Sequence, residues 1–369
     1  MRKPRSLIDH FSLLPDPRQS THRNKQHEFT SIIIIAILAV ICGADSWYDI
    51  ESFGIEKHDW LQRFLRLENG IPSHDTFGRV FSILTPESFA NCFASWVKDT
   101  RLSFKGTVVA IDGKSVRRSH DTNERPLHIV SAFATELGLC LGQRKVDTKT
   151  NEITAIPELL EMLALKGCIV TIDAMGTQGW IVKKIREQSA EYVLCAKANQ
   201  GRLHRDIKKI FEGSKRAMTL ATSMQKSHGR SEVRECRATD DLSLIRDRAR
   251  WEGLHSIAAI TDIRTVKGQT TATTRYFLSS LPANASLILA SVRAHWRIEN
   301  SLHWSLDMAF REDYARARLG HAQENLSLVR KLAFNILKRD TSTKSSLVTK
   351  RLRAGWNAEY LLKVTGITV

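Results

Sequence analysis

The sequence predicts an α/β protein, built from a mixed sheet flanked by helices, with a helical domain before it and a β-rich insertion within it. Apolar residues recur at helical spacing up to residue 104, and from residue 105 short apolar runs typical of buried strands alternate with helical stretches. With 369 residues, 42% of them hydrophobic, the chain can form more than one core. We expect a helical domain at 1–104, the α/β core at 105–200 and 282–340, the insertion at 201–281 and a basic tail at 341–369.

In the helical domain, a helix at Phe29–Cys42 is expected after the turn signal Pro15-Asp16-Pro17. The apolar run Ile32–Cys42 is 11 residues long, whereas a membrane-spanning helix needs about 20, so we interpret it as a buried helix. Further helices are predicted at Trp47–Phe64, after the N-cap residue Ser73, and from Pro86.

The core is expected to contain five strands. The first, Val108–Ile111, ends abruptly in Asp112-Gly113-Lys114, and so places a carboxylate at the end of a buried strand. The fourth ends in the same way at Asp173. A hairpin turn at 136–138 separates the second strand from the third, and helices flank the fourth strand. The second to fifth strands are predicted at Leu127–Thr135, Leu139–Val146, Cys168–Ile172 and Tyr192–Ala196. This order, with acids after the first and fourth strands, resembles that of ribonuclease-H-like nucleases.

The rest of the chain is predicted from weaker patterns. Short strands are possible in the insertion at Ser231–Cys236, Ser256–Ile263 and Thr274–Leu278. One long helix is expected from Asn284 through Phe310, followed by a basic helix at Ala322–Lys338.

Asp112 and Asp173 are the first candidates for chemistry. Two carboxylates brought together at strand ends repel each other, unless a divalent cation keeps both ionised. Oxygen ligands of this kind suit Mg²⁺ or Mn²⁺. The alternative is that both are ordinary turn-forming aspartates.

A third acid is sought in the segment 295–304, where Glu299 is the best candidate. At helical spacing, His295, Glu299 and His303 share one face, and Trp296, Asn300 and Trp304 share another. Asp307 and Asp313 compete for the role of third acid. The alternative is an amphipathic helix with partly exposed aromatic residues.

The charge balance favours a polyanionic partner. Lys and Arg number 55 against 39 Asp and Glu, for a net charge of +16. Within the insertion, His228, Arg230 and Arg234 alternate in a possible strand, which places them on one face toward DNA. Lys114 could contact a phosphate, although ordinary solvation in an exposed loop is the alternative.

The chain resembles the DDE-type transposases of bacterial insertion sequences, in the branch of the H-repeat-associated proteins. The resemblance covers nearly the whole length, and its motifs are distinctive when taken together. They are Asp16-Pro17-Arg18, Pro72–Phe77, Ile111–Lys114, Asn151-Glu152-Ile153, Thr171–Gly176, Tyr192-Val193-Leu194, Lys197–Gln200, His228-Gly229-Arg230 and the segment 295–313.

The resemblance implies a ribonuclease-H-like catalytic core in which Asp112, Asp173 and Glu299 bind two metal ions, Mg²⁺ or Mn²⁺. It also implies an insertion between the second and third acids. The spacing agrees, because 61 residues separate the first two acids and 126 separate the last two.

The sequence departs from the wider group at three positions around Glu299. That group has a Tyr, an Arg and a Lys where this chain has Val292, His295 and Leu306. The contacts with DNA ends are therefore expected to differ. Arg293, Arg297 and His303 are the substitutes we expect to make them.

The implied function is metal-dependent cleavage of element ends followed by strand transfer. The partners would be terminal inverted repeats and target DNA, held by at least a homodimer. One alternative is a relict transposase that binds DNA without cutting it. Another is a general repair or RNA-cleaving nuclease, which would leave the helical domain and the insertion unexplained. No signal peptide or spanning segment is predicted, so we expect a cytoplasmic, nucleoid-associated protein without membrane contact.

Overall fold

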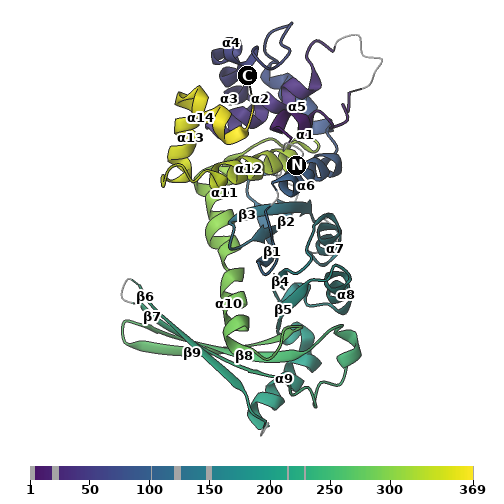
Figure 1. The fold of residues 1–369 in the computed structure, drawn as a ribbon, viewed down its shortest axis with the longest axis vertical. Helices are drawn as coiled ribbons and strands as arrows, with labels where there is room; N and C mark the ends of the chain where they lie inside the picture. Colours follow the sequence, from purple (N-terminus) through teal and green to yellow (C-terminus); the bar gives the residue numbers. More distant parts are fainter. Residues whose placement is uncertain are drawn as a thin grey trace.

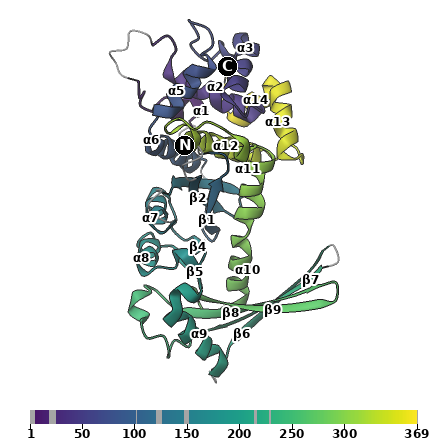
Figure 2. The ribbon, with the colours of Figure 1, turned by 180° about the vertical axis from the view of Figure 1, so that it is seen from behind.

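A computed structural model describes residues 5–18, 25–100, 102–119, 126–146, 152–213, 216–227 and 230–368. The molecule is elongated, with a helical domain at one end, a sheet with helices on both faces in the middle, and long hairpins at the other end (Figures 1 and 2). The helices of the first domain are α1 Leu7–Phe11, α2 Phe29–Cys42, α3 Trp47–Glu56, α4 His58–Leu61, α5 His74–Ile83 and α6 Pro86–Asp99.

Helix α2 forms the centre of the helical domain and confirms the prediction of a buried helix. Every residue from Ser31 to Ile41 is buried, so the helix has no solvent-facing side. The predicted caps are also present, since the Ser73 hydroxyl accepts a hydrogen bond from Thr76 N–H and Pro86 starts α6.

In the described part of the chain, no single helix is long and apolar enough to span a membrane. Helices α2 and α3 pass such a test only jointly, and they meet at 96°.

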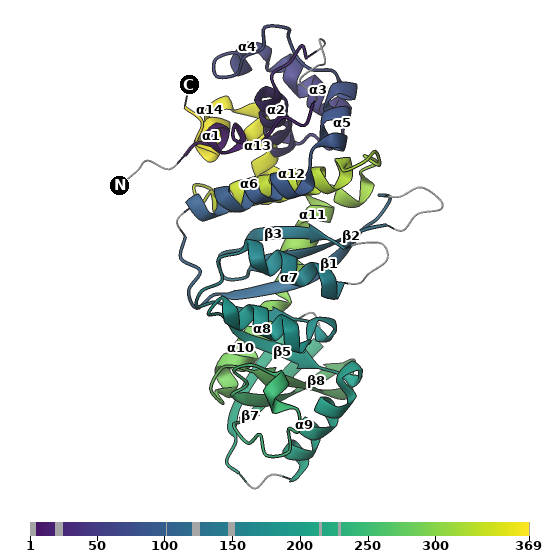
Figure 3. The same ribbon diagram turned by 90° about the vertical axis from the view of Figure 1, so that its right-hand side faces the viewer.

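A nine-stranded sheet runs through the rest of the molecule, in the order β3-β2-β1-β4-β5-β9-β8-β7-β6. Strands β1, β4 and β5 are mutually parallel, and the others join them as antiparallel neighbours. Helices α7 Glu152–Met162 and α8 Gly179–Glu187 lie beside the strands they connect (Figure 3). The strands are β1 Val108–Val116, β2 Leu127–Ala134, β3 Leu139–Lys145, β4 Ile169–Ile172, β5 Glu191–Ala196, β6 Thr219–Ser227, β7 Arg230–Thr239, β8 Ser256–Val266 and β9 Gln269–Ser279.

Strand β1 is longer than predicted. It continues through Asp112 to Val116, because β2 pairs with it as far as Val116 opposite Leu127. The prediction that Asp112 ends its strand was wrong. The parallel neighbour β4, in contrast, does end at Ile172.

The region 201–281 begins with α9 Gly201–Gly213 and then extends the same sheet. Strand β9 pairs with β5, from Val193 opposite Ser279 to Ala196 opposite Tyr276, and β8, β7 and β6 follow outward. The strands are longer than predicted, and β6 was missed.

The predicted continuous helix from Asn284 through Phe310 is broken. Helix α10 Ala285–His295 is followed by a π-helical turn, Ile298–His303, and by α11 Trp304–Met308. Ile298, Leu302 and Leu306 are completely buried, so one apolar stripe continues across the wider turn. A stripe of this kind does not distinguish α from π hydrogen bonding.

Helix α12 Ala322–Arg339 connects the helical domain to the sheet. The Asn325 amide donates to the carbonyls of Phe81 and Leu84 at the end of α5. The Asn335 amide pairs with both backbone groups of Cys140 on the edge strand β3, at 2.8 and 2.7 Å. The region 341–369 adds α13 Leu347–Trp356 and α14 Ala358–Thr365, and α13 packs on α2.

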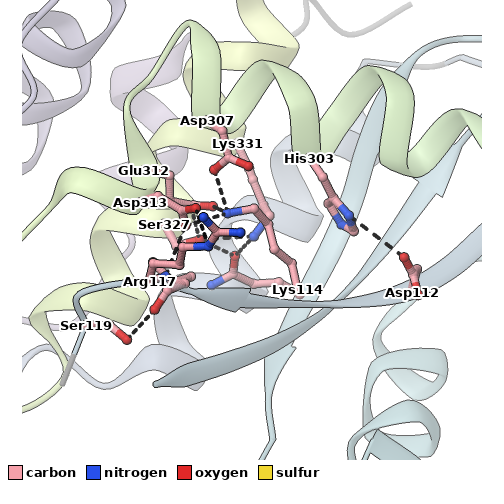
Figure 4. Close-up of polar contacts among 12 residues, drawn as sticks. Asp112, Lys114, Arg117, Ser119, His303, Asp307, Glu312, Asp313, Ser327 and Lys331 are labelled. Carbon is pink, nitrogen blue, oxygen red and sulfur yellow. Dashed lines mark hydrogen bonds and ion pairs between the residues drawn. The ribbon is translucent and has the colours of Figure 1, made fainter. Parts of the chain in front are cut away.

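A network of buried charges lies where α12 meets β1 (Figure 4). Glu312 is completely buried and receives hydrogen bonds from Lys114 Nζ at 3.1 Å and from Ser327 Oγ at 2.7 Å. Burial alone would raise the pKa of Glu312, but Lys114, Lys331 and Arg330 outweigh it and lower the pKa to about 2. The network therefore depends on an ionised Glu312.

We expect Glu312→Gln to lower the free energy of unfolding by about 3 kcal/mol at pH 7, because it leaves buried cations without their counter-charge. In the parent protein this contribution is complete above pH 4.5, the ordinary pKa, and is lost as the pH falls toward 2. Urea unfolding across this pH range measures both effects. Glu359→Gln, at an exposed position of α14, is the control, and equal midpoints for the two variants would contradict the prediction.

Candidate active site

Asp112 and Asp173 stand side by side on neighbouring parallel strands. In the register of β1 and β4, Ile111 pairs with Ile172, and each aspartate is the next residue. Neighbouring strands lie about 4.8 Å apart, and positions in register point to the same face of the sheet. The structure therefore brings these two predicted residues together.

Asp112 is mostly buried, and its charge is not compensated. Burial raises the pKa of this carboxyl, the nearby Glu152, Glu299 and Asp173 raise it further, and the pKa reaches about 7. Asp173 is more exposed and receives two hydrogen bonds from Lys197 Nζ, at 3.0 and 3.1 Å. Burial acts against this pair, but the Ala174 backbone and Lys197 prevail and lower the pKa of Asp173.

Glu152 is an acid of this site that our sequence analysis did not select. Its carboxylate lies 2.7 Å from His128 Nε2, and His128 Nδ1 lies 2.8 Å from the Ser115 hydroxyl. A Cβ atom at Gly113 would come within 2.2 Å of Glu152 Oε1 and 2.5 Å of His128 Nε2. Gly113 is therefore the residue that lets Glu152 lie against β1, and the Asp-Gly pair was the available signal.

The helical segment above the sheet presents the remaining candidates. His295 Nδ1 lies 3.0 Å from the Thr171 hydroxyl, beside Asp173, and burial lowers the pKa of His295 to about 4. His303 Nδ1 lies 3.8 Å from Asp112 Oδ2 (Figure 4). Burial, with help from Lys331 and Lys114, lowers the pKa of His303 to about 3, and its Nε2 atom has no hydrogen-bond partner. Glu299 lies between the two histidines in the chain, in the π-helical turn, and is exposed.

Lys114 is held inside the protein. Its ammonium group lies 2.7 Å from Asp307, 3.1 Å from Glu312 and 3.2 Å from Asp313, and its side chain is only 11% exposed. Burial opposes the charge, but these three carboxylates raise the pKa of Lys114. The two acids that competed with Glu299 are thus bound to Lys114.

Glu299 lines a groove of about 740 Å³, which lies between α10 and strands β7 to β9. Three predicted DNA-contacting residues line it: Arg230, Arg234 and Arg293. The walls contain five arginines and three acids, so the groove has net positive charge; they are Arg230, Arg234, Arg264, Arg275, Arg293, Glu232, Asp262 and Glu299.

Several of these arginines are already paired. Arg234 binds Glu232 and Asp262, at 2.5 and 3.1 Å, and Arg275 binds Asp262 at 2.8 Å. The Arg275 guanidinium also lies 5.8 Å from the ring of Trp296, which is 42% exposed. Arg264 and Arg275 were not predicted from the sequence, because their place in the groove depends on strand pairing.

The remaining predicted residues lie elsewhere. Arg297 is exposed but does not line the groove, and His228 falls outside the described residues. At the positions where the sequence departs from the wider transposase group, Val292 and Leu306 belong to the core and His295 faces the sheet.

We expect Gly113→Ala to fold, with a loss of about 1 kcal/mol, because the clashing atoms are the ends of side chains that can move. The displaced Glu152 would leave Asp112, so the pKa of Asp112 should fall from about 7 toward its ordinary value. Carbon NMR titration of labelled aspartate measures this. Gly201→Ala, where a Cβ meets nothing within 4 Å, is the control. An unchanged Asp112 titration in Gly113→Ala would refute this interpretation.

Comparison with known proteins identifies the family of this chain. Residues 103–336 match the family described as Transposase DDE domain, and residues 8–97 match DDE_Tnp_1-associated. The H repeat-associated putative transposase YhhI of Escherichia coli (strain K12) is 40% identical, over 98% of this chain and 97% of its own. YbfD of the same organism, which has the same description, is 42% identical over 64% of this chain and 96% of its own. A solved structure of piggyBac transposase, a synaptic complex with hairpin DNA, is 12% identical to this chain, with a TM-score of 0.42. The match covers 97% of this chain and 77% of that one. The family match and the full-length relative establish that this chain belongs to the DDE-domain transposases, alongside the H repeat-associated proteins.

Proposed function

We propose that this protein is an active, metal-dependent DNA transposase that cleaves element ends and joins them to target DNA. The observation that carries the proposal is the pair Asp112 and Asp173, at matching positions of the parallel strands β1 and β4, with Glu299 near enough to act on Asp112. A groove rich in arginine begins at Glu299. Acids for chemistry and cations for DNA thus lie next to each other.

The donor set fits Mg²⁺ or Mn²⁺. All three donors are carboxylates, which these hard cations prefer. Burial, and after it the neighbouring Glu152, raise the pKa of Asp112, and a bound cation would offset both. Among the described residues, no three acids, histidines or cysteines stand close enough to hold an ion as they are. Asp173 would exchange Lys197 for the cation, and Glu299 would move inward from its exposed position.

When bound, the two ions would supply Lewis-acid activation of the attacking hydroxyl and stabilisation of the leaving oxygen in an in-line phosphoryl displacement. The chain itself supplies position. Strands β1 and β4 fix Asp112 and Asp173, and His295 anchors the end of α10 to β4 through Thr171. His303 and the buried residues of the π-helical turn exclude water from one side of Asp112.

We assign the third carboxylate to Glu299 and a structural role to Lys114. Asp307 and Asp313 each bind Lys114, whereas Glu299 raises the pKa of Asp112 and lines the groove. Lys114 has three carboxylate partners and little exposed surface, which disfavours contact with a phosphate. Its charge instead joins β1 to the segment after α11.

We assign the DNA ends to the groove. Arg230 and Arg234 would exchange their carboxylate partners for phosphates, and Arg293 would bind a further phosphate. Such contacts are strongly salt-dependent. Transposition requires two ends in one complex, so we propose at least a homodimer on DNA.

A relict that only binds DNA remains the second candidate, since one relative, the Inactive transposase YbfQ of Escherichia coli, is 44% identical over 21% of this chain.

The test of function is cleavage of a plasmid that carries this gene with its native flanks, in Mg²⁺ or in chelator. We expect metal-dependent cuts at the borders of the element, reduced at least a thousandfold in Asp112→Ala, Asp173→Ala and Glu299→Ala. Mapping of the cut positions by primer extension measures the result. Glu161→Ala, at an exposed position of α7, is a control.

Survival of cleavage in Glu299→Ala alone would move the third carboxylate to another acid. Protection of the borders without cuts would favour the relict. Cuts spread over the plasmid without border preference would favour a general nuclease.

We also expect Glu152→Gln to raise, severalfold, the Mg²⁺ concentration that gives half-maximal cleavage, because it removes a negative charge from beside Asp112. Titration of cleavage with Mg²⁺ measures this. Glu158→Gln, on an exposed part of the same helix, is the matched control. An identical Mg²⁺ requirement in both variants would exclude Glu152 from the site.

A further inference from the structure

A second cluster of arginines lies on the opposite side of Asp112 from the groove. We call it the Arg–Tyr patch; its members are Arg117, Arg118, Arg311, Tyr314 and Arg316. Arg117 and Arg118 directly follow β1, while the other three belong to the segment after α11. The patch is thus assembled from two segments nearly 200 residues apart in the sequence.

The centre of the patch is the ring of Tyr314, which is 56% exposed. The guanidinium groups of Arg118 and Arg311 lie 5.0 and 5.2 Å from its centroid. Both arginines have a left-handed backbone, with φ of 59° and 49°. Only four non-glycine residues in the described ranges have a positive φ, and two of them meet at this ring. Strained backbone of this kind concentrates at functional sites.

The positive charge of the patch is only partly neutralised. Arg117 is 84% exposed, and the carboxylate that pairs with it at 3.5 Å, Asp313, is shared with Lys114. Arg118, Arg311 and Arg316 are exposed as well. An anionic partner would therefore find several guanidinium groups on one surface.

A cleft of about 450 Å³ separates this surface from the start of α3. Arg311, Tyr314 and Arg316 line one wall, and Tyr48, which is 65% exposed, lines the other. The two acids of the cleft are engaged elsewhere. Asp45 binds Arg351 at 3.2 Å, and Asp49 accepts hydrogen bonds from the backbone at the start of α3. They leave the arginine wall free to meet an anion.

The position of the patch relative to Asp112 suggests its ligand. From Asp112 to Val116 strand β1 advances four residues, or about 13 Å, and Arg117 and Arg118 follow directly in the turn. The segment from α10 to the residues after α11 follows the same direction: Arg293 lines the groove, His303 lies near Asp112, and Arg311 belongs to the patch. The candidate active site thus lies between two arginine-lined surfaces.

We propose that the Arg–Tyr patch binds the phosphate backbone of DNA on the side of the cut opposite the groove, so that one duplex is held on both sides of the reacting phosphate. This rests on the proposed function. Arginine and tyrosine side chains are common phosphate ligands that position a duplex without reading its sequence. Flanking DNA before cleavage, and target DNA during joining, would occupy the patch.

The salt dependence of DNA binding tests the patch independently of cleavage. The double variant Arg118→Gln/Arg311→Gln should lose two phosphate contacts from a generic 40-bp duplex. The slope of log affinity against log salt should then weaken by about 1.8, so the advantage of the parent protein shrinks about tenfold between 50 and 200 mM salt. Fluorescence anisotropy of the full chain measures this. Arg117→Gln/Arg316→Gln should behave in the same way, and Arg63→Gln/Arg66→Gln, two exposed arginines of the helical domain, is the control.

A second comparison locates the contact. The parent protein should bind a border duplex that extends 20 bp past the cut position more tightly than one that ends there, and the patch variants should lose that difference. The proposal for the patch alone would be overturned if the parent protein and all variants had the same slope of log affinity against log salt. It would also be overturned if the patch variants still bound the longer border duplex more tightly than the shorter one. Slopes unchanged together with an altered oligomeric state would assign the surface to a second copy of the chain. A parent protein that binds neither duplex would overturn the proposed function together with the patch.

Discussion

The buried ion network around Glu312 is the constraint on which the rest of the structure depends. Burying a carboxylate and two ammonium groups is expensive in free energy, and it is tolerated only when each charge has partners in correct geometry. Here Lys114 comes from β1, Glu312 from the segment after α11, and Lys331 from α12. Three segments far apart in the sequence must therefore meet in one arrangement. That arrangement ties α11 and the segment after it to strand β1, two residues beyond Asp112.

Local patterns in the sequence predicted most of the elements but not their partners. The apolar runs of β1, β4, β5 and α2 were recognisable because burial dictates composition directly. The extension of β1 past Asp112 was not, since polar Gly113 and Lys114 remain in the strand only because β2 pairs with them. The strands after α9 were under-predicted for the same reason: their exposed ends alternate weakly and are held by the ladder.

Of the candidate site, the two aspartates were predicted from their strands, and the structure places them together. Glu152 was not selected, because its approach to Asp112 depends on the absence of a side chain at Gly113, a relation between distant residues. Lys114 looked like a loop lysine because its three carboxylate partners all come from beyond residue 300. The arginines of the groove belong together only after β7, β8 and β9 have paired.

The complete burial of α2 has a consequence while the chain is being synthesised. Part of its cover comes from α12 and α13, and Arg351 donates hydrogen bonds to the Val40 carbonyl 311 residues earlier in the chain. At 5–20 residues per second, a ribosome needs roughly 15–60 s to deliver that cover after α2 has emerged. During this interval the apolar surface of α2 is exposed in the nascent chain, where chaperones or other nascent chains can bind it. A chain that ended before α12 would leave this face of α2 exposed permanently.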